Sequence, residues 1–352
     1  MEYSFWAWAG FGLFILFMLA LDLGVLNRNA HVVKYREAAI WSAVWVALAS
    51  LFAAWVFWSH GSLSGKEFVA GYLIELSLSV DNLFVFLLIF SYFKVPAKFQ
   101  HRVLFWGVLG ALVMRITMIG LGAALIERFH WIIYVFGVFL IYTGFKMLRQ
   151  EETDVHPEDN PIVRFVTRHI PISREYEGEK FFTVRNGKKT GTLLLLVLVI
   201  VEITDLVFAV DSIPAIFGIT QNTFIVYTSN VFAILGLRSL YFLLAGIIEK
   251  FHYLKLGLSI VLMFVGVKML SEGKVAQYFG LSKETIITGS LTFVGLILLG
   301  SVAASAIWPR PAEAQVEVEL PEGFDSPFDD DQGRLGADET GVPETSKQSR
   351  ER

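Results

Sequence analysis

Two segments of the chain place acidic side chains inside long apolar stretches. Both share one pattern, an acid six positions before an Asp that an amide or a hydroxyl follows: Glu75, Asp81 and Asn82 in the first, Asp205, Asp211 and Ser212 in the second. A further acid, Glu202, lies three residues before Asp205 and shares its helix face. A central Asp costs about 2.5 to 3.5 kcal/mol on membrane-insertion scales. The acids therefore indicate a site for a bound cation, for protons, or for both.

The balancing positive charge and the ligand chemistry narrow the kind of site. Arg115 and Arg238 are the cations that lie as deep in apolar sequence as the acids, and we expect them to be counter-charges or gating residues rather than ion ligands. The chain has no Cys, which excludes thiolate metal sites. A shell of carboxylates, Asn82, Ser212 and backbone carbonyls is all oxygen and suits Mg²⁺, Ca²⁺ or Mn²⁺. Residue chemistry alone does not choose among these three ions.

The spacing of the acids also bears on local structure. On a regular helix the step from Glu75 to Asp81 rotates the side chain by about 120°, so a continuous helix cannot aim both at one ion. Pro214 has no amide hydrogen for the carbonyl of Val210, and Ser77 offers a local hydrogen bond that competes with the helix. We therefore expect both spans to be broken or unwound here, which would free backbone carbonyls for the ion.

The elements that carry these residues are predicted to be membrane helices. The chain is 55% apolar with a mean hydropathy of +0.57, and 18% of its residues are charged, against roughly 25% in soluble domains. A span takes about 20 mostly apolar residues. Nine windows qualify: 5–26, 38–59, 67–92, 103–126, 130–148, 191–217, 223–248, 253–270 and 285–307. We expect an all-α integral membrane protein with nine transmembrane helices, and no enzyme, because no nucleotide-binding loop or hydrolase signature is present.

The acidic pattern belongs to an internal repeat. Arg115 corresponds to Arg238, and the string that begins at Lys146 corresponds to the one that begins at Lys268. Repeat A covers 67–148 and repeat B covers 191–270. Each holds three spans, and because three is odd, the second copy enters the membrane from the opposite side. The sequence thus predicts two inverted three-helix repeats, an arrangement in which secondary transporters hold a site near the bilayer midplane.

Charge and composition organise the remainder of the chain. Lys and Arg gather in alternate connections, which places the N-terminus outside and the C-terminus in the cytoplasm. Residues 150–190 form a predicted cytoplasmic linker, and the end of this linker has the pattern of a strand followed by an Asn-Gly turn, which favours a hairpin. Residues 1–308 form the predicted transporter domain. The acidic tail 309–352 lacks apolar periodicity and is expected to be disordered.

The strings from Glu75 to Phe86 and from Glu202 to Ala215 closely resemble the signature segments of the TerC family. That family is named for tellurium resistance and includes Alx-type manganese exporters. The resemblance covers about residues 5 to 307. It implies a multi-pass protein of the cell inner membrane that exports Mn²⁺. It also implies an ion site built from the acids of the two motifs, which are Glu75, Asp81, Glu202, Asp205 and Asp211.

Together these observations lead to a hypothesis of alternating access. Mn²⁺, as a transported substrate and not a tightly bound cofactor, enters from the cytoplasm and leaves on the other side, and proton antiport is the expected coupling because crowded carboxylates take up protons when the ion departs. Two alternatives remain: a Ca²⁺ or broad divalent-cation exchanger, and a membrane scaffold of a metal-stress or tellurite-resistance complex. The other expected partners are protons and the lipid bilayer, with no nucleic acid. The sequence does not set the oligomeric state.

Overall fold

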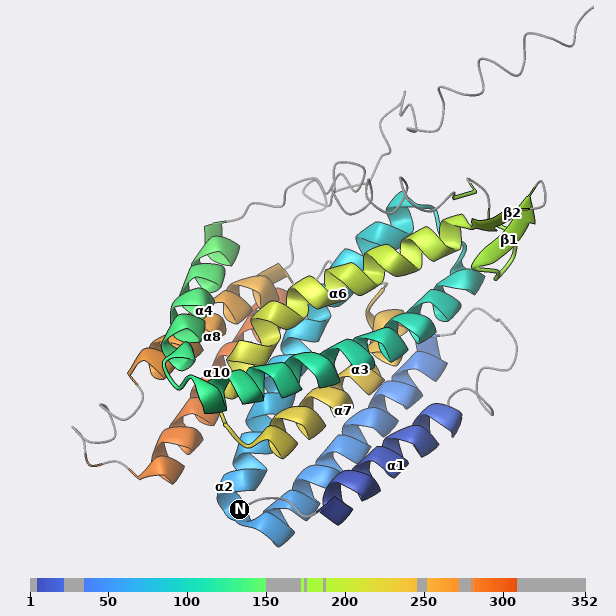
Figure 1. Ribbon diagram of the computed structural model, residues 1–352. Helices are drawn as coiled ribbons and strands as arrows, with labels where there is room; N and C mark the ends of the chain where they lie inside the picture. Colours follow the sequence, from blue (N-terminus) through green and yellow to red (C-terminus); the bar gives the residue numbers. More distant parts are fainter. Residues whose placement is uncertain are drawn as a thin grey trace, which may run out of the picture.

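The computed structural model describes residues 5–21, 35–149, 172–173, 176–185, 188–245, 252–271, 280 and 282–308. These ranges hold eight helices and one two-stranded sheet: α1 Phe5–Leu21, α2 Tyr35–Tyr92, α3 Ala97–Arg128, α4 Ile132–Arg149, β1 Phe182–Arg185, β2 Lys188–Gly191, α6 Leu193–Phe217, α7 Thr223–Leu244, α8 His252–Leu270 and α10 Lys283–Ile307. The helices pack into one bundle, with the sheet at the ends of α3 and α6 (Figure 1).

The composition of the helices and of their outer faces fits a lipid environment. Among the described residues, seven helices are long and apolar enough to cross a membrane, and α1 is a shorter apolar helix. Apolar side chains point outward, with Leu13, Leu296 and Leu299 exposed to 70%, 66% and 71%. In water such apolar faces promote aggregation, whereas in a bilayer they contact lipid chains at no cost. The prediction of an all-α, multi-pass membrane protein is confirmed.

Over the described residues, each of the nine predicted windows matches helix, but not nine separate helices, and 22–26 and 246–248 lie outside these residues. Windows 38–59 and 67–92 both lie in α2, whose two helical segments meet at Gly61, where φ is 87° and ψ is 171°. Only Gly adopts this combination without strain. Figure 1 shows a sharp bend between the two segments of α2, which run in nearly opposite directions on either side of it. The part of the chain that the structure describes thus has eight helices, one of them folded at Gly61.

The predicted breaks in the acidic segments are wrong. Gly61 is the residue of α2 with non-helical angles, and α6 continues through Pro214. The hydroxyl of Ser77 donates to the Leu73 carbonyl at 2.7 Å, in the preceding turn of its own helix, and so does not compete with the helix. Pro214 lies close to the end of α6, where the loss of one backbone hydrogen bond does not stop the helix.

The predicted hairpin is confirmed. Strand β1 pairs with β2 in antiparallel register, with Phe182 opposite Gly191 and Arg185 opposite Lys188. Thr192 separates β2 from α6 and caps this helix by accepting a hydrogen bond from the backbone of Leu195 at 3.4 Å. The turn itself, most of the linker and the tail 309–352 lie outside the described residues.

The interior is divided into two apolar clusters. One gathers α1, α2, α3, α6 and α7, and the other gathers α4, α8 and α10 with parts of α2, α3, α6 and α7. On α3, Leu112 belongs to the first cluster and Ile119 to the second, and on α6 the same change occurs between Val201 and Ala209. The buried charged residues between these positions, Arg115 on α3 and Asp205 on α6, belong to a polar layer where the two clusters meet.

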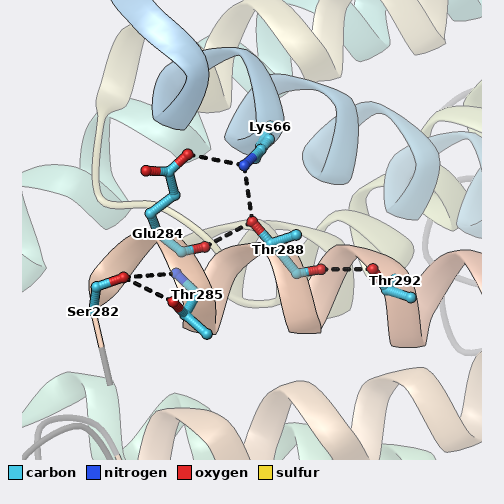
Figure 2. Close-up of polar contacts among 6 residues, drawn as sticks. All are labelled: Lys66, Ser282, Glu284, Thr285, Thr288 and Thr292. Atoms are coloured by element: carbon cyan, nitrogen blue, oxygen red, sulfur yellow. Dashed lines mark hydrogen bonds and ion pairs between the residues drawn. The ribbon is translucent and has the colours of Figure 1, made fainter. Parts of the chain in front are cut away.

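A polar contact at the periphery of the bundle links α10 to the second segment of α2. Lys66 donates to a carboxylate oxygen of Glu284 at 2.9 Å and to the hydroxyl of Thr288 at 3.0 Å (Figure 2). Ser282 caps α10 by accepting from the backbone of Thr285 at 3.1 Å. Because the Glu284 side chain is 54% exposed, this pair contributes little to stability. It shows where the start of α10 lies against α2.

Candidate functional site

One arginine joins the two acidic segments in the polar layer. Arg115 of α3 donates to a carboxylate oxygen of Glu75 on α2, to the hydroxyl of Ser212 on α6 at 2.9 Å, and to Asp205 Oδ1 on α6 at 3.4 Å. These residues are all buried, and the exposed fraction of the whole residue is 1%, 0%, 1% and 3% for Arg115, Glu75, Ser212 and Asp205. Removing an ion from water costs several kcal/mol. These charges can be buried because the positive charge of Arg115 offsets the negative charges of the carboxylates.

This cluster, defined as Glu75, Arg115, Asp205 and Ser212, leaves acceptor atoms unused. Glu75 Oε2 and Asp205 Oδ2 have no hydrogen-bond partner among the described residues, and the same holds for Oδ1 of Asn82, which is 2% exposed. A buried acceptor without a partner costs about 1–3 kcal/mol. Two carboxylates also face one guanidinium. The cluster therefore offers oxygen atoms and negative charge to a cation or a proton.

Glu202 lies at the edge of the cluster, half-buried and under the electrostatic influence of Asp205. Its carboxylate fills the space beside Gly110 of α3, where a Cβ would collide with it. One turn earlier, a Cβ on Gly107 would lie 3.4 Å from Val201 of α6. The two glycines thus let α3 and α6 approach closely. Sequence reasoning missed them, although their spacing of three residues on one helix face was a usable signal.

The other two predicted acids lie apart from the cluster. Asp211, half-buried, accepts from the hydroxyl of Thr143 on α4 at 3.3 Å and interacts electrostatically with Lys146. Asp81, also half-buried, interacts with Lys255 of α8. Each of these acids therefore interacts with a lysine of another helix. Nothing in the spacing of the acids pointed to these lysines.

The five acids are thus not assembled into one ion shell in this structure. Within the described ranges, no group of three or more His, Cys, Asp or Glu side chains is placed to hold a metal ion. Arg238, the repeat counterpart of Arg115, lies with Glu37 and His101 in the wall of a small cavity of about 40 Å³ between α1, α2, α3 and α7. The structure brings together Glu75, Asp205 and Ser212 around Arg115, and it places the remaining predicted site residues outside that cluster.

A bundle of apolar helices with a buried, charged polar layer defines a multi-pass membrane protein with an ionisable site in its interior. The chain belongs to the TerC family of integral membrane proteins, whose family model matches residues 60–313.

Three relatives illustrate how similar other members are. The uncharacterized membrane protein STKORF319 of Myxococcus xanthus is 53% identical over 305 residues, which cover 87% of this chain and 93% of the relative. Alx of Escherichia coli K12, named as a proposed membrane-bound redox modulator, is 49% identical over 272 residues, or 75% of this chain and 85% of the relative. An uncharacterized membrane protein of Rickettsia bellii is 38% identical over 304 residues, which cover 86% of this chain and 99% of the relative. No solved structure matches significantly.

Proposed function

We propose that this protein is a secondary transporter that exports a divalent metal cation, Mn²⁺ first of all, from the cytoplasm in exchange for protons. The observation that carries the proposal is the pairing of Arg115 with Glu75 and Asp205, carboxylates of two different helices, in the interior of the bundle. Ionisable residues inside a membrane are expensive and mark ion pathways or proton relays. The oxygen ligands favour a hard divalent cation, and Mn²⁺ follows from the family resemblance.

In the proposed mechanism, Arg115 and the transported cation compete for the same oxygens. In this structure the guanidinium contacts these oxygens directly. A divalent cation would take the carboxylates of Glu75 and Asp205 with the hydroxyl of Ser212, and Glu202 would add charge from the edge of the cluster. Arg115 would then be released. When the cation leaves, Arg115 and protons balance the carboxylates again.

Asp81, Asn82 and Asp211 are proposed to join the ion pathway in another conformation. Each of the two acids is held by interactions with α4 or α8 in this structure, and a shift of these helices relative to α2 and α6 would free it. Arg238 is proposed to serve the second repeat as Arg115 serves the first. These roles rest on the repeat pattern.

The packing of α4 on α8 supports the proposed inverted repeat. A Cβ on Gly137 would lie 3.0 Å from the Gly266 carbonyl, and one on Gly144 would lie 2.8 Å from the Ser259 carbonyl. At one common offset, the repeat aligns Gly137 with Ser259 and Gly144 with Gly266. Swapping the two repeats therefore converts the Gly137–Gly266 contact into the Gly144–Ser259 contact. This is what two repeats related by a two-fold axis should show.

This relation completes the proposed topology. The two segments of α2 count as separate spans, which gives nine, with the N-terminus outside and the C-terminus in the cytoplasm of a cell inner-membrane protein. The name of the Escherichia coli relative refers to redox chemistry. We do not extend a thiol-based activity to this chain, because it contains no Cys.

The test is Mn²⁺ flux into and out of proteoliposomes that contain the purified protein and an internal divalent-cation reporter. We expect a Mn²⁺ flux that is faster when a proton gradient opposes it. Protein-free vesicles should show no such flux. Competition by Ca²⁺ at equal concentration would favour the broad exchanger. No flux from correctly reconstituted protein would contradict transport and favour the scaffold.

A further inference from the structure

The β1–β2 hairpin carries an exposed apolar face. Phe182 and Val184 are 60% and 66% exposed, and because they alternate along β1 they lie on the same face of the sheet. Lys189 pairs with Val184 across the strands and is also exposed on that face. The face thus combines a cation with two large apolar side chains, whose exposure to water is unfavourable.

The position of the hairpin along the chain places it at the membrane boundary. Strand β2 ends at Gly191, and α6 starts at Leu193 with a run of nine Leu, Val and Ile residues. Two Cα–Cα steps, or about 7–8 Å, is the longest distance that can separate these ends. The sheet lies at the ends of α6 and α3 in Figure 1. The hairpin therefore lies where α6 enters hydrocarbon.

Several contacts fix the orientation of the exposed face. The hydroxyl of Tyr176 donates to the Phe93 carbonyl at 2.7 Å, and Arg102 of α3 pairs with Glu179 at 3.0 Å. The Arg102 guanidinium also lies over the ring of Phe181, 5.3 Å from its centre. The segment is thus docked on the first turns of α3, and its exposed face has a defined direction.

We propose that this face binds the headgroup layer of the bilayer that α6 spans and selects anionic lipid. Phe182 and Val184 insert at the boundary between headgroups and acyl chains, and Lys189 attracts lipid phosphate. Trp106 of α3, which is 44% exposed and packs edge-on against Phe181, supplies an amphipathic ring beside the hairpin. The hairpin is a lipid anchor for the loop between the two repeats.

The absence of Cys from the chain makes a site-specific test simple. Phe182→Cys and Val184→Cys are each spin-labelled, and collisions with oxygen, which partitions into lipid, and with a water-soluble nickel chelate are measured by electron paramagnetic resonance. The reference is Val207→Cys on the lipid-facing side of α6, where Val207 is 57% exposed. Vesicles of phosphatidylcholine are compared with vesicles that also contain phosphatidylglycerol.

The labels at 182 and 184 are expected to collide with oxygen more than with nickel, though less so than the label at 207. Phosphatidylglycerol should increase this preference, and Lys189→Glu should abolish the increase without affecting the reference label. A preference for nickel at both hairpin positions would place the face in water and overturn the proposal. Equal protection from both reagents in vesicles and in detergent would also overturn it, because that result indicates a protein partner or a second copy.

Discussion

Replacing Arg115 by Met removes the single cation of the buried cluster and leaves two carboxylates in place. The side chains of Arg115, Glu75 and Asp205 are 1%, 0% and 4% exposed, so water cannot screen the loss. Breaking a buried ion pair by removing one partner costs about 3–5 kcal/mol. Met retains most of the aliphatic stem of Arg, so the cavity left behind is small. We therefore expect Arg115→Met to lower the free energy of unfolding by about 3–5 kcal/mol.

The assay is reversible unfolding in mixed micelles by titration with dodecyl sulfate, followed by circular dichroism. The matched control is Arg102→Met, which breaks the pair of Arg102 with Glu179, where the side chains are 40% and 37% exposed. This change should cost about 0–1 kcal/mol. Adding Glu75→Gln and Asp205→Asn to Arg115→Met should recover most of the loss, because no unpaired charge remains. If Arg115→Met is as stable as the control, or if the triple variant recovers nothing, the charge-compensation reasoning is refuted.

Three glycine substitutions, with a fourth as a control, test other parts of the structure. Gly110→Ala should displace the Glu202 carboxylate and lower Mn²⁺ flux. The melting temperature should stay near that of the wild type, because the atoms that must move are at the end of a flexible side chain. Unchanged flux would argue against a role for that carboxylate. Gly61→Ala should cost about 1–3 kcal/mol in the same micelle titration, because its backbone angles strain any other residue. Gly289→Ala, with no atom within 4 Å, is its control and should not be destabilised. Gly144→Ala should also cost about 1–3 kcal/mol, since its Cβ would press on a backbone carbonyl of α8; stability equal to that of the control would contradict close packing of α4 on α8.

Hydropathy located the helices well because membrane spans require long apolar runs. The boundaries of α4, α6 and α8 agree with the predicted windows within two residues, whereas α3 starts six residues before its window. The Asn-Gly pattern found the hairpin. Hydropathy could not show how the two segments of α2 are joined. The reversal depends on the backbone angles of Gly61, and an apolar window carries no information about these.

Spacing was less informative about the candidate site. The angular mismatch between Glu75 and Asp81 suggested a broken helix, yet α2 remains helical there and gives each acid its own neighbours. Spacing within one helix cannot reveal contacts from another, and so Thr143 and Lys146 as neighbours of Asp211 were not predicted. The expected pairing of acid and arginine did emerge for Arg115, because charge balance inside a membrane demands a partner.

The most direct test of the central claim is Mn²⁺ flux in proteoliposomes for Glu75→Gln and Asp205→Asn, measured beside Glu179→Gln. Glu179 has a partly exposed side chain that pairs with Arg102 outside the cluster, so its variant controls for the loss of a carboxylate as such. We predict that Glu75→Gln and Asp205→Asn reduce flux to the level of protein-free vesicles, whereas Glu179→Gln transports like the wild type. Wild-type flux in either cluster variant, with correct folding and reconstitution, would contradict the assignment of these buried carboxylates as the ion site.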